Sequence, residues 1–385
     1  MTFVQLSTVQ HRIRVGTPLP FHVRDADQTL LLARGQVVKT ADQLESLMRR
    51  GALVDSEEAG PTPAAPIRQD RPDRAEIGAG VSARDAVRAA RPEQLPALLR
   101  TAITMATRVL SQPTQAGFAA QLETVTDPLV AIVERDPDLA IFQILRQEGN
   151  YLTQYGVNHA IHCGITAFLI GTRLGWSEAD IRRTFKAALT MNISMFELQG
   201  ELATQATPMS DDQRAAILSH PHRSVGLLEQ GGVRDAEWLR AISLHHDEDG
   251  SHDCDIAGLL RRADIYTAKL SPRSNREALG ADIAARMMFA SDRDHPATSA
   301  IVKEFGLYPP GCHVKLASGE TGVVVRRGAQ AHTPYVAATT SPQGMALPQP
   351  LRRDTAQRPF GIAAVLRQGA AGMRFTPDVL LRACA

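Results

Sequence analysis

The chain has 385 residues, a length that favours two or three domains over one. Hydrophobic residues make up 44% and charged residues 22%, which excludes a disordered, collagen-like or coiled-coil protein as a whole. Basic and acidic residues number 42 and 41, so no net field draws the chain towards nucleic acid or an anionic membrane. We therefore predict no nucleic-acid partner and no membrane partner.

The amino terminus has no basic head followed by an apolar stretch, so we expect a cytoplasmic protein. The longest uncharged stretch near the middle, from Gly156 to Thr172, is shorter than the roughly 20 residues of a membrane span. Four cysteines lie far apart without a CxxC pair, and we interpret them as buried or idle thiols: Cys163, Cys254, Cys312 and Cys384.

The first part of the chain, residues 1–57, has the composition of a small strand-rich module. Two β-prone runs flank a turn at residues 25–28 and predict a hairpin. Thr40 can cap a short helix that carries Leu44 and Leu47 on one face, and the segment ends at a further apolar run, residues 53–55. Residues 58–80 are rich in Pro, Ala and charge, which is typical of a linker.

The remainder of the chain divides into a helical part and a second β-rich part. Apolar spacings of three and four recur over residues 81–305 and predict a helical bundle. From residue 306 to residue 385 the pattern changes, with alternation at Val314 and Leu316, a turn at Gly319 and a return strand at 323–325. We predict a mainly α protein, a helical core flanked by small β-rich amino- and carboxy-terminal modules.

Seven of the twelve histidines fall between residues 159 and 252. Because neutral imidazole is the commonest metal ligand, this clustering indicates a metal site to which several helices contribute. His245 and His246 are adjacent, and helix neighbours point about 100° apart, so the pair suits two ions, or one ion and one substrate group. The alternative is a solvated helix end with two incidental histidines.

The order of landmarks between residues 136 and 279 resembles the HD-GYP subgroup of HD-domain phosphodiesterases, which hydrolyse cyclic dinucleotides such as cyclic di-GMP. The landmarks are a histidine in NYLTQYGVNHAIHCG, the helix ending AALTMNISM, the histidine-proline of AAILSHPHRSV, the histidine pair of HHDEDGS and the aspartate of RRADIY. The resemblance implies an HD-domain helical core. It also implies five metal-ligand positions: His159, His220, His245, His246 and Asp264.

The family pattern is broken at its defining positions. Met191 and Asn192 replace the His-Asp doublet, Met195 replaces the lysine that follows it, and the family's Gly-Tyr-Pro run is absent after Ser251. Tyr155 stands where some members carry a glutamate ligand. The resemblance therefore implies a degenerate active site without catalytic residues.

The loss of the doublet bears on how many ions the site can hold. Two dications about 4 Å apart repel by roughly 15 to 20 kcal/mol even at an effective dielectric near 20, so anionic bridging ligands are essential. Asn192 is neutral, and the thioether of Met191 suits Cu(I) better than Mn, Fe or Zn. We predict either no cofactor or a single divalent metal ion, held by His220, His245 and His246 with Asp264.

Structural interpretations of these residues stay open at this point. His159 suits a core histidine with a hydrogen-bond partner, and His220 before Pro221 suits a simple helix break. Asp264 suits a surface ion pair with Arg261 or Arg262. Met191 and Met195, four residues apart, suit core filling.

Our leading hypothesis is a catalytically degenerate HD-GYP-like signalling protein that binds a protein partner or a cyclic dinucleotide without hydrolysis. The alternative is a metal-dependent cyclic di-GMP phosphodiesterase with a reduced metal site, assisted by the acidic loop of Asp247, Glu248 and Asp249. A third hypothesis is a scaffold whose β-rich modules bind the partner while the helical core dimerises. A homodimer is compatible with each of them.

Overall fold

The computed structural model describes residues 3–6, 13, 16–25, 29–38, 43–44, 47, 52–55, 82–146, 154–247, 254–274, 277–366 and 375–383. The chain forms two compact units, Met1–Gly78 and Ala79–Ala385. The predicted linker, residues 58–80, lies outside the described residues, and the predicted domain boundaries stay predictions. Within the described ranges, no helix combines the length and the apolar character needed to cross a bilayer.

The first unit is built on a small antiparallel sheet with the strand order β1-β4-β2-β3. Its strands are β1 (Phe3–Gln5), β2 (Val23–Arg24), β3 (Leu30–Leu32) and β4 (Leu53–Asp55). The predicted hairpin is confirmed by the antiparallel pairing of β2 with β3, although residues 26–28 of its turn lie outside the described residues. Gln43, Leu44 and Leu47 are helical, within the predicted short helix.

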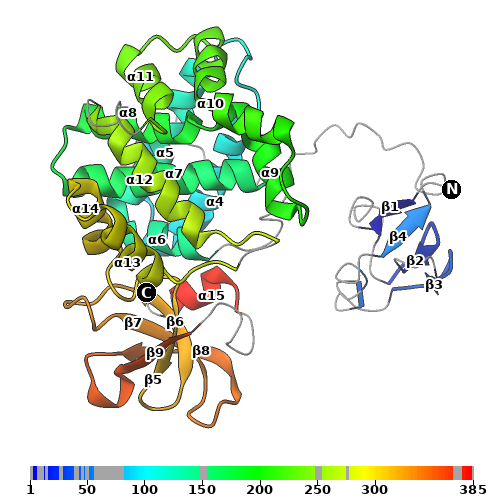
Figure 1. Cartoon of the computed structure of the whole chain (residues 1–385). Helices are drawn as coiled ribbons and strands as arrows, with labels where there is room; N and C mark the ends of the chain where they lie inside the picture. The colour runs from blue at the N-terminus through cyan, green and yellow to red at the C-terminus, as the bar shows by residue number, and fades with distance from the viewer. Residues whose placement is uncertain are drawn as a thin grey trace. The chain divides into compact units, whose positions relative to one another are not determined.

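The second unit is mainly helical (Figure 1). Its first helices are α3 (Ala83–Ala89), α4 (Leu95–Leu110), α5 (Phe118–Arg135), α6 (Pro137–Leu145), α7 (Tyr155–Arg173) and α8 (Glu178–Thr190). They are followed by α9 (Phe196–Thr204), α10 (Asp211–Gln230), α11 (Ala236–Leu244), α12 (Asp255–Leu270), α13 (Ala281–Asp292) and α14 (Pro296–Phe305). The mainly α fold class with flanking β modules is thereby confirmed.

Helix α7 lies inside the helical part and packs against α8, α9, α12 and α14. Nearly all of its residues are buried, which agrees with its long uncharged sequence. At its start, Gly156 allows a close approach, because a Cβ there would lie 2.6 Å from the backbone of Phe196 at the start of α9. These contacts therefore fix the positions of the polar residues of α7 relative to the neighbouring helices.

Side-chain caps set the starts of three helices around this centre. Ser177 begins α8 and Asp235 begins α11, and each side chain accepts a hydrogen bond from the backbone N–H three residues ahead. Ser210 and Gln213 form a reciprocal capping box at the start of α10. These caps satisfy N–H groups that the helices cannot pair internally, and they fix where α10 and α11 begin.

The carboxy-terminal part of the second unit is a five-stranded antiparallel sheet with the order β8-β7-β6-β5-β9. The strands are β5 (His313–Leu316), β6 (Thr321–Arg326), β7 (Tyr335–Thr340), β8 (Ala346–Asp354) and β9 (Ile362–Leu366). A last helix, α15 (Pro377–Arg382), follows in a segment that the sequence analysis predicts as β-rich. The alternation at Val314 and Leu316 and the turn at Gly319 are confirmed as β5 and its return to β6.

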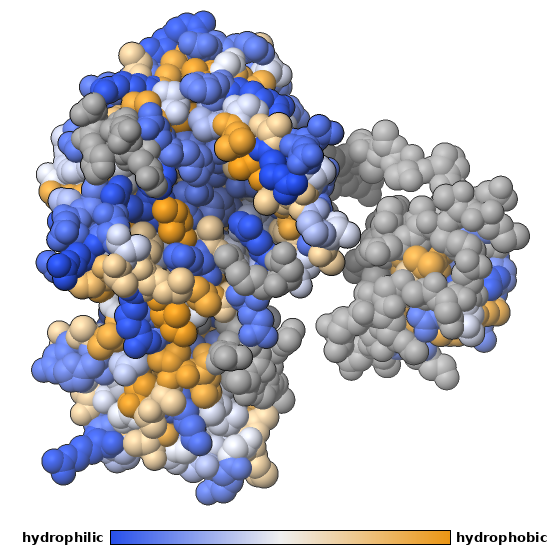
Figure 2. Space-filling view, in the orientation of Figure 1, coloured by the Kyte–Doolittle hydropathy of each residue, from blue (hydrophilic) through white to orange (hydrophobic). Residues whose placement is uncertain are grey.

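The sheet is joined to the helices by apolar and charged contacts. Phe142 of α6 and Leu380 of α15 pack with Val323 and Val325 of β6. Arg327 forms ion pairs with Asp138 of α6 and with Glu304 of α14, the second at 2.8 Å. On the face shown in Figure 2, apolar residues gather where the helices adjoin the sheet. Helix α13 carries three exposed apolar side chains, Ile283, Met287 and Phe289.

His313 makes this junction sensitive to pH. Its Nε2 accepts a hydrogen bond from Arg146 Nη1 at 2.9 Å, so the ring must be neutral. Burial, assisted by the Arg146 charge, lowers the pKa of His313 to about 4 from 6.5. The unfolded chain therefore takes up the proton more readily, and stability is lost as pH falls from the unfolded value towards the folded one.

We predict that His313 accounts for about 2 kcal/mol of the stability lost between about pH 7.5 and about pH 5. The variant His313→Gln keeps a neutral acceptor for Arg146 but cannot titrate, so its free energy of unfolding should fall less over that range. Urea unfolding of both proteins at the two pH values measures the difference. An equal loss in both proteins would exclude His313 as the cause.

Candidate metal and ligand site

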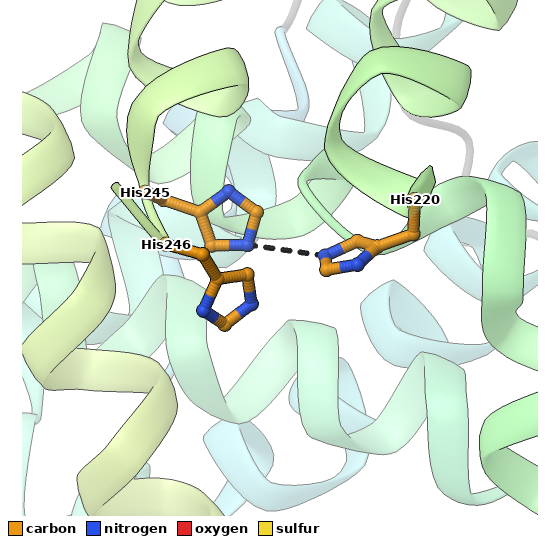
Figure 3. A group of neighbouring side chains, drawn as sticks. All are labelled: His220, His245 and His246. Carbon is orange, nitrogen blue, oxygen red and sulfur yellow. Dashed lines mark hydrogen bonds between the residues drawn. The ribbon is translucent and has the colours of Figure 1, made fainter. Parts of the chain in front are cut away.

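Three histidines converge between α10 and the end of α11. His220 lies on α10, His245 and His246 directly follow α11, and their rings face one another (Figure 3). The Nε2 atoms of His220 and His245 are 3.2 Å apart, and the three residues bring ligand atoms within 4.8 Å of one another. His220 and His245 are fully buried, whereas His246 is exposed. The reading of His245 as an incidental residue at a solvated helix end is therefore wrong.

The backbone decides which nitrogen of each buried ring carries the proton. His220 Nδ1 lies 2.5 Å from the carbonyl oxygen of Ile217, and His245 Nδ1 lies 2.6 Å from that of Ile242. A carbonyl oxygen can only accept, so both Nδ1 atoms are donors. In the neutral rings, both Nε2 atoms therefore carry lone pairs, and these lone pairs face each other.

Pro221 explains why the Ile217 carbonyl is available to His220. Helix α10 continues through Pro221, so the reading of this histidine-proline pair as a helix break is wrong. Proline has no N–H, and the missing bond would have ended on the carbonyl four residues earlier, that of Ile217. The Ile242 carbonyl is free for a different reason, because it belongs to the last turn of α11.

Two facing lone pairs repel unless a proton or a metal ion lies between them. Burial lowers the pKa of His220 to about 4 and that of His245 to about 3, with repulsion from His246 adding to the effect, so neither ring takes up a second proton, on Nε2, near neutral pH. Two nitrogens bound to one tetrahedral zinc ion are about 3.3 Å apart, close to the observed separation. The three histidines therefore fit one divalent ion of the kind that prefers imidazole.

A second polar group lies between α7 and α12. His159 Nε2 is 2.7 Å from Asp264 Oδ1 and 3.5 Å from Cys163 Sγ. Burial opposes protonation of His159, but Cys163 and the Asp264 hydrogen bond outweigh it, so the pKa of His159 lies well above its usual value. The same bond outweighs burial at Asp264, so the pKa of Asp264 lies well below its usual value. Cys163 is buried, which agrees with its interpretation as a buried thiol, and its position four residues after His159 is the sequence signal that relates the two.

The five predicted ligand positions thus divide into two groups, three histidines in one and His159 with Asp264 in the other. Asp264 does not pair with Arg262, which bonds instead to Asp292 at 2.6 Å, so the Arg262 part of that alternative is wrong. Of the predicted acidic loop, Asp247 is described and exposed, whereas Glu248 and Asp249 lie outside the described residues.

The residues that replace the family doublet lie at the boundary of these groups. Met191 is fully buried in the main apolar core, as expected for core filling. Asn192 is also buried, and its Nδ2 donates to Asp264 Oδ1 at 3.5 Å. The amide is neutral, so it brings no negative charge to the position that the family gives to an aspartate. A carboxylate-bridged pair of ions therefore does not fit these residues.

A cavity of about 480 Å³ adjoins both groups. Asp264 is the one acidic residue among its described lining residues, and Met195 lies in its wall where the family has a lysine. Arg273 supplies positive charge. Its guanidinium stacks 5.4 Å from the ring centre of Tyr155 and donates to the Tyr155 hydroxyl at 3.2 Å. The cavity is further lined by His159, His220, His246, Gln199 and Gln205.

Comparison with known proteins adds one distant relative. The chain is 26% identical over 237 residues to the cyclic di-GMP phosphodiesterase PA4108 of Pseudomonas aeruginosa. The match covers 58% of this chain and 56% of that protein, so the chain spans just over half the length of this relative. No family model matches the chain.

A solved structure shows a weaker likeness. It is Bd1817, a HDG"Y"P protein from Bdellovibrio bacteriovorus, with 12% sequence identity and a TM-score of 0.45. The superposition covers 78% of this chain and 98% of that one. Similarity at this level does not establish a shared function. The chain is distantly related to the HD-GYP phosphodiesterase family, as its sequence landmarks predict.

The role of Pro221 can be tested by restoring the missing N–H. In Pro221→Ala the new N–H competes with His220 Nδ1 for the Ile217 carbonyl, so the His220 ring loses its orientation. We expect the affinity for Zn²⁺ to fall about 10-fold or more, as for other residues that orient metal ligands. The free energy of unfolding should stay the same or rise, because the helix gains a hydrogen bond.

The matched control is Pro128→Ala, which removes the proline inside α5. It should leave zinc affinity unchanged in calorimetric titrations. If Pro221→Ala binds zinc as tightly as the native protein, Pro221 does not orient His220.

Proposed function

We propose that the chain binds a cyclic dinucleotide in the cavity beside the three histidines and does not hydrolyse it efficiently. The observation that carries the proposal is Asn192, a neutral amide that bonds Asp264 where the family has an aspartate. Hydrolysis by a pair of ions requires negative ligands that hold the two together. Asp264, which already bonds His159, supplies one negative charge, whereas two divalent ions carry four positive charges.

The cavity supports a nucleotide as the ligand. Its volume of about 480 Å³ falls within the usual range of small-molecule sites, roughly 300 to 1,000 Å³. Arg273 offers a planar cation for a phosphate group, and the Tyr155 ring beneath it keeps that cation in place. Gln199 adds an amide whose Oε1 has no hydrogen-bond partner among the described residues and suits a hydrogen bond to a base or a sugar. These features favour a cyclic dinucleotide as the ligand. Binding of a protein partner stays a prediction.

A single ion at the three histidines adds positive charge beside the cavity. When bound, it supplies a Lewis acid that attracts phosphate oxygens. His220, His245 and His246 would hold it, and their neutral rings leave its charge available to an anionic ligand. This intact group also favours the second candidate function, a phosphodiesterase with a reduced metal site. Strong metal-dependent turnover of cyclic di-GMP by the native protein would establish that function and contradict ours.

The contribution of Arg273 to ligand binding provides the first test. Arg273→Ala should weaken the binding of cyclic di-GMP by roughly 10- to 100-fold, because a phosphate loses its charged hydrogen-bond donor. Calorimetric titration of zinc-loaded protein measures the affinity. The control, Arg108→Ala, removes an exposed arginine of α4 outside the cavity and should bind like the native protein. Equal affinities in all three proteins would refute this ligand site.

Restoring the doublet provides the second test. The double variant Met191→His with Asn192→Asp returns an imidazole and a carboxylate to the buried boundary of the two groups. We expect increased metal uptake and the appearance of cyclic di-GMP hydrolysis above the native level. The single variant Met191→His lacks the bridging carboxylate. Its metal uptake and its hydrolysis of cyclic di-GMP should therefore both increase less than those of the double variant. A double variant that takes up more metal than the native protein yet stays inactive would show that the doublet is not what prevents hydrolysis.

A further inference from the structure

We propose that Cys163 completes a separate zinc site with His159 and Asp264. The ligand atoms are His159 Nε2, Cys163 Sγ and a carboxylate oxygen of Asp264, which lie within 4.8 Å of one another. Cys163 is not among the positions that the family resemblance provides. The inference does not rest on the proposed function, since zinc content and nucleotide binding are measured independently.

Two helices bring these atoms together. His159 and Cys163 are four residues apart on α7, so they lie on one face of that helix. Asp264 and Thr267, three apart on α12, face them, and Cys163 Sγ lies 3.0 Å from Thr267 Oγ1. Thr267 Oγ1 donates to the Ala263 carbonyl at 2.7 Å, so its oxygen accepts from the thiol. The sulfur is thereby held close to His159 in the interior.

The arrangement is not that of a cysteine-histidine-aspartate catalytic triad. In a triad the carboxylate bonds one ring nitrogen and the nucleophile bonds the other. Here Asp264 and Cys163 both approach Nε2, while the buried Nδ1 has no hydrogen-bond partner among the described residues. One N–H cannot serve two partners well, whereas a metal ion is bound by several ligand atoms that converge on one point.

The distances and the ligand types indicate zinc. A tetrahedral zinc ion separates a thiolate sulfur from an imidazole nitrogen by about 3.6 Å, and Cys163 Sγ is 3.5 Å from His159 Nε2. The His159–Asp264 contact of 2.7 Å would need to widen by roughly 0.6 Å to admit the ion. Thiolate, imidazole and carboxylate together are a ligand set that zinc accepts and magnesium does not.

Charge is balanced at this site. Zinc replaces the thiol proton of Cys163 and the proton on His159 Nε2, and both protons leave to solvent. The thiolate and the Asp264 carboxylate then supply two negative charges to one dication. Asn192 offers a fourth ligand, because it is 1% exposed and its Oδ1 has no hydrogen-bond partner within the described part of the chain. Rotation of the amide would turn that oxygen towards Asp264, where Nδ2 now points.

The experiment is cobalt substitution of the full chain, with zinc content measured in parallel. Cobalt bound by a thiolate gives a sulfur-to-metal charge-transfer band in the near ultraviolet, which three histidines cannot produce. We expect this band in the native protein and its loss in Cys163→Ser. We also expect about two zinc ions per native chain and about one in the variant.

Two further variants make the result specific. Cys254→Ser removes another free cysteine, partly exposed and outside both groups, and should keep the band and both ions. His246→Ala removes a ligand of the other group and should keep the band while losing one ion. A native protein without the band, or a Cys163→Ser protein that retains it, would overturn the proposal. The native measurement decides the matter even if Cys163→Ser fails to fold.

Discussion

The candidate site depends on two imidazole nitrogens that face each other without a proton between them. His220 and His245 each use Nδ1 to donate to a backbone carbonyl, so their Nε2 lone pairs meet at 3.2 Å. That contact is repulsive in the bare protein and favourable around a cation. The helices maintain it through Pro221, which frees one carbonyl, and through the end of α11, which leaves the other unpaired. The backbone thus orients both rings for a cation in the absence of a ligand.

Charge then determines what such a site can do. Asp264 faces His159, and the neutral Asn192 stands beside it, so no carboxylate is left to join two ions as a bridge. On the proposed function, the retained histidines and the cavity with Arg273 attract an anionic ligand. Binding and hydrolysis would then separate in this chain. The first needs positive charge beside a cavity, and the second needs negative charge between metals.

Sequence patterns predict much of this architecture and only part of the site. Apolar periodicity gives the helical core, and the alternation at Val314 and Leu316 gives a carboxy-terminal strand, because both depend on local burial. The family landmarks predict five ligand positions, but they cannot show that those positions form two groups. That division depends on how α7, α10 and α12 pack. From the sequence alone Cys163 is interpreted as a buried or idle thiol, because only packing places it beside His159 and Thr267.

The central claim concerns the protonation of two rings, and nitrogen NMR of the histidine side chains tests it directly. In metal-free protein near neutral pH, the spectra should show His220 and His245 neutral, with the proton on Nδ1 in both. Addition of Zn²⁺ should shift both Nε2 resonances and leave the Nδ1 protons in place. A proton on Nε2 of either ring, or Nε2 resonances that ignore zinc, would contradict the account.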